Sequence, residues 1–258
     1  MDEAAIERKG LTPIEPELAK IDAVRNLPGL HTAISRLQSR GVNVLFAFGS
    51  EEDRKDSSRV IAAAIQAGLG LPERDYYLKT DAKSVELRRK YLVHVARMLK
   101  LAGAVPRKAA ADAKSILDLE TRLAQASMNN VDLRDPDKTH HPMTLAALSK
   151  AMPNLGWAEF HRDQSVAAEV PVNVWTPDFF RAEDALLRSV PIATWKAYLP
   201  WHLLSATAAT LPSRFVDEDF ALKGKTLAGV PEIQPRWKRC VNATDDAMGM
   251  ALGRIYVR

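Results

Sequence analysis

Apolar residues recur at steps of three and four through most of the chain, the spacing that places them on one face of an α-helix. Two neighbouring stripes of this kind are separated by Pro28 and Gly29. Such faces must be covered by other elements, so the pattern favours a mainly α, multi-helical domain. The helices that it predicts cover residues 15–27, 29–40, 82–101, 144–151, 157–162, 178–188, 192–211, 214–221 and 236–257, with a further helix opened by Pro106.

Local signals mark both ends of the clearest helix, 82–101. Thr80 or Asp81 is a suitable N-cap, because either side chain can accept a hydrogen bond from the first turn. Gly103 stands where a glycine commonly ends a helix.

Pro200 lies inside the predicted helix 192–211. Proline removes one backbone donor and its ring clashes with the carbonyl one turn earlier. The sequence therefore predicts a kink or a break near Leu199.

Two segments depart from the helical spacing. Residues 42–48 are rich in β-forming side chains that partly alternate, which predicts a strand, and 171–177 predicts a second extended piece. Ser50–Ser58 is polar and is expected to form a loop or a hairpin turn, whereas Val60–Gln66 is ambiguous. The expected fold is therefore mainly α, with one or two short β-strands or a hairpin.

The composition excludes several classes of protein. The chain has 258 residues, 47% apolar and 26% charged, which is typical of one large globular domain or two small ones. One Cys leaves no intrachain disulfide framework and no Cys-rich zinc site. No run approaches the roughly 18 apolar residues of a membrane span. The acidic start, Met1–Glu3, lacks the apolar stretch of a secretory signal.

The charge gives little support to nucleic-acid binding. The chain has 36 Lys and Arg against 32 Asp and Glu, a formal charge of +4, and the two signs are interleaved. The densest basic cluster, Arg236–Arg239, is interpreted as a solvated helix face. A nucleic-acid binder stays an alternative that rests only on the pI of about 9.1.

Signatures of catalysis are absent from the sequence. No two of the six histidines are three or four residues apart, so the zinc-binding H-E-x-x-H pattern is missing, and so is the G-x-S-x-G nucleophile turn. Cys240 lies on an apolar helical stripe and is expected to be a buried, inert thiol. His94 and His202 lie among apolar residues and are expected to be hydrogen-bonded core histidines.

The segment Gly68–Leu78 reads G-L-G-L-P-E-R-D-Y-Y-L. Two glycines and a proline fix a tight path, and the two tyrosines can pack and hydrogen-bond at once. The structural interpretation is a locked loop that pins neighbouring helices. A ligand-binding loop is the alternative.

This segment resembles the G-L-G-L-P-x-R-D-Y-Y-L signature of the N-terminal domain of the neprilysin and endothelin-converting-enzyme family of zinc metallopeptidases. Stretches similar to the family's L-E-x-x-L-A-x-A, W-x-x-Y-L-x-W-H and R-W-x-R-C elements follow in order, from Leu119, Trp195 and Arg236. The resemblance therefore covers nearly the whole chain. The residues that it assigns to family motifs are Gly68, Leu69, Gly70, Leu71, Pro72, Arg74, Asp75, Tyr76, Tyr77, Arg236, Trp237 and Cys240.

The resemblance implies that residues 1–258 are a partial chain. In this family the zinc ligands and the catalytic Glu come from a C-terminal domain, toward which the last helix, about 236–258, would lead. No catalytic residue, metal ligand or cofactor is therefore assigned to this chain, and zinc belongs to the parent enzyme. The implied partners are peptide substrates and the missing catalytic domain, with no nucleic acid. The family is often periplasmic, secreted or at the cell surface, but this chain leaves its localisation open.

The implied function is that of a substrate-chamber or lid domain. It would form one wall of the closed chamber in which a zinc-dependent metalloendopeptidase cleaves short peptides. The alternative is a stand-alone helical module that binds peptides or a protein partner. The last helix ends on its apolar face at Ile255–Arg258 without a cap, which favours the first interpretation.

Overall fold

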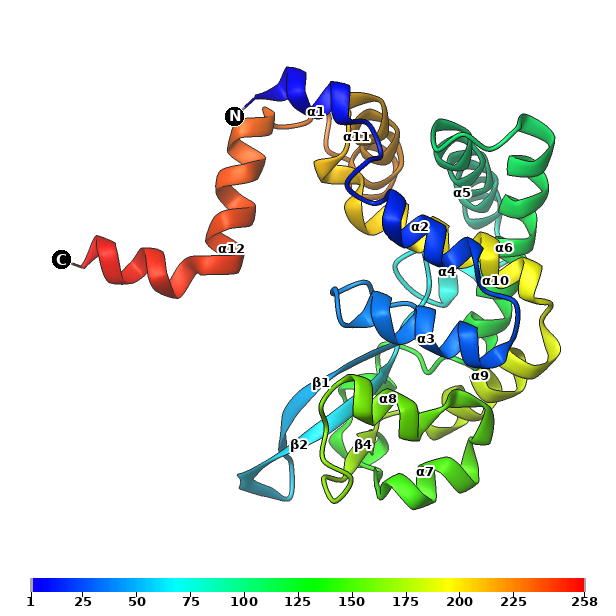
Figure 1. Ribbon diagram of the computed structural model, residues 1–258, viewed down its shortest axis with the longest axis vertical. Coiled ribbons are helices and arrows are strands. Elements are labelled where there is room, and N and C mark those ends of the chain that lie inside the picture. The colour runs from blue at the N-terminus through cyan, green and yellow to red at the C-terminus, as the bar shows by residue number, and fades with distance from the viewer. Residues whose placement is uncertain (1, 258) are drawn as a thin grey trace.

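The computed structural model describes residues 2–257, and these are mainly helical (Figure 1). The strands are β1 (Phe46–Asp53), β2 (Asp56–Gln66), β3 (Pro142–Met143) and β4 (Val172–Val174). The α-helices are α1 (Glu3–Lys9), α2 (Glu15–Asp22), α3 (Leu27–Gln38), α4 (Asp75–Leu78), α5 (Ala82–Leu101), α6 (Pro106–Ala126), α7 (Leu145–Ala151), α8 (Trp157–Asp163), α9 (Pro177–Ser189), α10 (Ile192–Thr207), α11 (Ser213–Phe220) and α12 (Arg236–Tyr256).

Short helical turns connect several of these elements. A π-helix, η5 (Ala221–Leu227), continues α11. The four 3₁₀ turns are η1 (Asp132–Arg134), η2 (Pro136–Lys138), η3 (Pro153–Leu155) and η4 (Ala208–Thr210). The fold class predicted from the sequence, mainly α with a few short strands, is confirmed. Within the described residues, no helix combines the length and apolar character needed to cross a membrane.

Local capping explains where the helices begin and end. The Asp81 side chain accepts from Ser84 N at the start of α5, and Gly103 lies beyond its end at φ +100°, so the predicted bounds of α5 are confirmed. The predicted helix 15–27 is too long. The Asn26 side chain accepts from Gly29 N and starts a new helix at Leu27, because its cap satisfies that helix's first turn.

The four strands form one small sheet in the order β1-β2-β4-β3. β1 pairs antiparallel with β2 in the register Phe46↔Gln66 to Glu52↔Val60, and β2 pairs in parallel with β4. The prediction for Ser50–Ser58 is wrong in extent. The strands continue through most of this polar segment, because cross-strand pairing outweighs the weak local preference of its residues.

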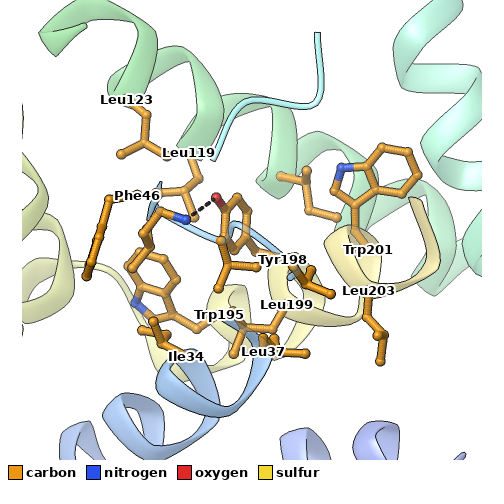
Figure 2. Close-up of a cluster of buried hydrophobic side chains, with 14 of the residues drawn as sticks. Ile34, Leu37, Phe46, Leu119, Leu123, Trp195, Tyr198, Leu199, Trp201 and Leu203 are labelled. Atoms are coloured by element: carbon orange, nitrogen blue, oxygen red, sulfur yellow. Dashed lines mark hydrogen bonds between the residues drawn. The ribbon is translucent and has the colours of Figure 1, made fainter. Parts of the chain in front are cut away.

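The helix does not break near Leu199, because α10 continues through Pro200, whereas a kink there stays a prediction. The helix contributes a row of buried side chains to the centre of the core, and its Trp195, Tyr198 and Trp201 are at most 1% exposed. Burial of each such side chain contributes about 1.5–3 kcal/mol, which together offsets the roughly 3 kcal/mol cost of an interior proline. Figure 2 shows the buried residues around these three side chains, among them Ile34, Leu37, Phe46, Leu119 and Leu123.

The core also contains one carboxyl group without a partner. Glu183 on α9 is 0% exposed, and neither of its side-chain oxygens makes a hydrogen bond. Burial, and secondarily the nearby charge of Asp184, raise the pKa of Glu183 well above its usual value of 4.5. Burial therefore favours the neutral form of Glu183 in the folded protein.

Glu183→Gln should flatten the dependence of stability on pH. Above pH 4.5 the unfolded chain ionises at Glu183 while the folded chain does not, so stability falls as pH rises toward the folded pKa, by up to about 1.4 kcal/mol per pH unit. The glutamine variant cannot ionise and should lose this slope. The free energy of unfolding, measured with urea at pH 5 and pH 7, gives this slope for each variant. The control is Glu232→Gln, at an exposed position. Equal slopes for the parent and Glu183→Gln would contradict the assignment.

Candidate functional site

The two glycines of the Gly68–Leu78 loop occupy positions where no side chain fits. Gly68 has φ +82°, and a Cβ there would lie 2.5 Å from the Tyr198 hydroxyl and 2.8 Å from Leu45 Cα. A Cβ on Gly70 would lie 1.9 Å from the Tyr91 hydroxyl. Both glycines are therefore required by close packing against core tyrosines, which explains the unusual local sequence.

A buried carboxylate lies beside this loop. Glu120 on α6 is 0% exposed, and its Oε2 accepts hydrogen bonds from the hydroxyls of Tyr77 at 2.8 Å and Tyr91 at 2.6 Å. Its Oε1 accepts from Trp201 Nε1 at 3.2 Å and lies 3.1 Å from His202 Nε2. We call these five residues the Glu120 cluster. It joins side chains of α4, α5 and α10 to α6, and it fully satisfies a charge that would otherwise be costly to bury.

The electrostatics of the cluster keep its phenols protonated. Burial, and next the charge of Glu120, raise the pKa of Tyr77 and of Tyr91 well above the usual 10.0. Both hydroxyls therefore stay donors to the carboxylate. The Tyr77 hydroxyl also accepts a hydrogen bond from Leu71 N at 2.8 Å. This bond connects the Gly68–Leu78 loop, called the motif loop below, to the Glu120 cluster. This arrangement holds α4, α5 and α10 against α6.

Further contacts of the loop hold the segment that follows α6. Arg74 Nη1 donates to the Ser127 carbonyl at 2.7 Å. Gln66, just before the loop, exchanges two hydrogen bonds with the backbone of Met128, at 2.8 and 2.9 Å. The structure therefore places the loop as a connection between the sheet, α6 and the helices around it.

The other motif residues of the loop lie at its two faces. Leu71 is buried, and Leu69 and Tyr76 are half-buried against the core. Pro72 is exposed, and Asp75 begins α4. The structure brings the Gly68–Tyr77 part of the sequence-predicted set into one compact site.

The remaining three motif residues lie elsewhere, on α12. Arg236 Nη2 donates to the Leu211 carbonyl at 2.9 Å and anchors the start of this helix, while Trp237 is 61% exposed. The expectation that Cys240 is buried is wrong, since its side chain is exposed. α12 stands apart from the other elements in Figure 1 and has no buried residue, so its apolar stripe is uncovered within the described chain.

The two core histidines are as predicted. His94 is 2% exposed, with Nδ1 3.1 Å from Glu218 Oε1, and His202 is 8% exposed and bonded in the Glu120 cluster. The roles of Glu120 and Tyr91 were not recognised from the sequence. The available signal is a Glu on the apolar stripe of its helix beside Ile116 and Leu123, a position where an unpaired charge is rarely found.

The described residues do not fit a zinc ion. No group of three or more His, Cys, Asp or Glu side chains between residues 2 and 257 is placed to hold a metal.

Gly70→Ala should lower the free energy of unfolding by about 1–3 kcal/mol, because the added methyl group would overlap the Tyr91 hydroxyl. Gly49→Ala is the matched control, since a Cβ at Gly49 meets no atom within 4 Å. Chemical denaturation of both variants measures the difference. An unchanged stability of Gly70→Ala would contradict the packing described above.

Glu120→Gln should cost about 1.5–3 kcal/mol, because a neutral amide loses the charge-assisted bonds and turns one donor toward other donors. The control is Glu86→Gln, which removes a carboxylate paired with Arg89 at the surface and should leave stability almost unchanged, because water screens this pair. The same denaturation measurement applies. Equal effects of the two variants would show that the Glu120 cluster does not stabilise the core.

Comparisons with known proteins find relatives over the whole chain. The family model described as peptidase family M13, for its N-terminal domain, matches residues 1–258. Endothelin-converting enzyme 1 of Cavia porcellus is 31% identical over 212 residues, which are 80% of this chain and 28% of that protein. Neprilysin-3 of Drosophila melanogaster is 31% identical over 230 residues, 84% of this chain and 29% of that protein. The chain thus spans less than a third of these relatives.

Solved structures share the fold. The zinc metalloprotease of Mycobacterium tuberculosis, solved in complex with an inhibitor, superposes with a TM-score of 0.94 at 34% identity, over 99% of this chain and 39% of that one. PepO from Lactobacillus rhamnosis has a TM-score of 0.83 at 20% identity, a likeness of fold alone. The resemblance seen in the motifs is confirmed, and the chain belongs to peptidase family M13, as an N-terminal domain of that family.

Proposed function

We propose that this chain is a wall of the substrate chamber in a zinc-dependent metalloendopeptidase that cleaves short peptides. The observation that carries the proposal is the match to the zinc metalloprotease of Mycobacterium tuberculosis, which extends over 99% of this chain but only 39% of that enzyme. A chain that matches this share of a peptidase is suited to a supporting part in the reaction.

The rigidity of the core suits such a wall. The Glu120 cluster and the motif loop fix α4, α5, α6 and α10 relative to one another through buried hydrogen bonds. A wall that keeps its shape can limit the size of the molecules that enter and exclude water from the reaction. In the parent enzyme, the zinc ion and the residues that activate water would lie on the part outside this chain.

The uncovered stripe of α12 supports a place within a larger protein. Val241, Met248, Leu252 and Ile255 are between 41% and 72% exposed on this helix. Several large apolar side chains exposed on one element often mark a contact with another part of a protein. In the proposed arrangement, the catalytic part of the peptidase covers this stripe.

The purified chain should not cleave a fluorogenic short peptide, with or without added zinc, and should bind no stoichiometric zinc by calorimetry. The polypeptide encoded by the longer reading frame around this chain should cleave the same peptide and lose activity with a chelator. A downstream H-E-x-x-H pattern in that frame is expected. Zinc-dependent cleavage by the 258-residue chain alone would overturn the proposal, whereas peptide binding by an isolated chain with no catalytic frame beside it would favour a stand-alone binding module.

A further inference from the structure

A cleft of about 590 Å³ lies where the start of α9 meets the end of α6 and the following segment. Three cations (Arg74, Lys138 and Arg181), two carboxylates (Asp132 and Asp178), His141 and Thr176 are the lining side chains that bear on its chemistry. Arg74 comes from the motif loop. The packing of this loop depends on its glycines and on Tyr77, and it does not account for most of the hydrogen-bonding capacity of the Arg74 guanidinium.

Two of the three lining cations are already neutralised. Arg181 pairs with Asp178 at 2.5 Å, and Lys138 pairs with Asp132. Arg74 has no carboxylate partner within the described residues, and its one hydrogen bond is to the Ser127 carbonyl. Its Nε is buried and makes no hydrogen bond. The cleft therefore carries one guanidinium charge without a counter-charge.

Other polar groups of the cleft also lack partners. Thr176 is 3% exposed, lines the cleft, and has a side-chain oxygen without any hydrogen bond. It is the N-cap residue of the thirteen-residue helix α9, yet it makes no side-chain capping bond. His141 lines the same cleft, and its buried Nδ1 is unpartnered too. Buried polar groups are rarely left unpaired in proteins unless a water or a ligand completes them.

The Arg74 guanidinium, the unpaired polar side chains and the start of α9 together favour the binding of an anion. A helix N-terminus carries partial positive charge and unpaired backbone N–H groups, and the planar guanidinium of Arg74 matches the two oxygens of a carboxylate. The cleft is too large for a carboxylate alone, and Ala126, Met128, Pro177 and Phe179 add apolar surface to its lining. We propose that this cleft binds a carboxylate joined to a short apolar segment, as at the C-terminus of a peptide. The inference uses residues of this chain alone, so it stands or falls separately from the catalytic proposal.

Calorimetric titration of the purified protein with N-acetyl-trialanine tests the proposal. The peptide acid should bind, and its C-terminal amide should bind at least ten-fold more weakly, because only the acid supplies the anion. Butyrate in a parallel titration separates the two sources of the group: tighter binding of the peptide acid supports a peptide terminus, and equal binding supports a free short-chain acid in the same site. Failure of both acids to bind with a Kd below about 1 mM would overturn the proposal.

Variants assign the binding to the cleft. Arg74→Gln should weaken binding of the peptide acid at least ten-fold, and Thr176→Val, which is close to isosteric, should weaken it several-fold. Arg188→Gln is the matched control, since it removes the same charge from an exposed position at the far end of α9 and should leave the affinity unchanged. Melting temperatures show whether Arg74→Gln stays folded, and Thr176→Val carries the test if it does not. Parent-like affinity in both Thr176→Val and a folded Arg74→Gln would refute the site.

Discussion

The burial of one carboxylate organises this domain. Glu120 lies on α6 at 0% exposure, and its burial is offset by hydrogen bonds from side chains of three other helices. Each of these donors must arrive at a fixed distance, so the cluster sets how α4, α5 and α10 lie against α6. The glycines of the motif loop follow from the same constraint, since the tyrosines that serve the core leave no room for a Cβ beside them.

Elements with local signals were predictable, and elements that depend on distant partners were not. The sequence predicts α5 to the residue because Asp81 and Gly103 mark its two ends within a few positions. The polar residues of Ser50–Ser58 look like a loop until the pairing of β1 with β2 is known. α10 continues through Pro200 because it is surrounded by the core, which its own sequence does not describe.

The residues of the candidate site likewise divide into those with a local sequence signal and those that depend on distant partners. Its glycines, proline and tyrosines are conspicuous in the sequence, so Gly68–Leu78 could be identified before the fold was known. The carboxylate that they surround could not, because Glu120 lies more than 40 residues away and its partners come from three helices. The prediction that Cys240 is buried fails for a related reason. An apolar stripe indicates that a face needs a cover, but not whether the described chain supplies it.

The parallel pairing of β2 with β4 has a consequence for synthesis. Ala62 pairs with Val172, so β2 leaves the ribosome more than a hundred residues before its neighbour. Since synthesis proceeds at about 5–20 residues per second, the β2 edge of the β1-β2 hairpin stays without its β4 partner for roughly 5–20 s. Asp56 and Arg59 put charges on the outer half of that strand, where they discourage a second nascent chain from pairing there first.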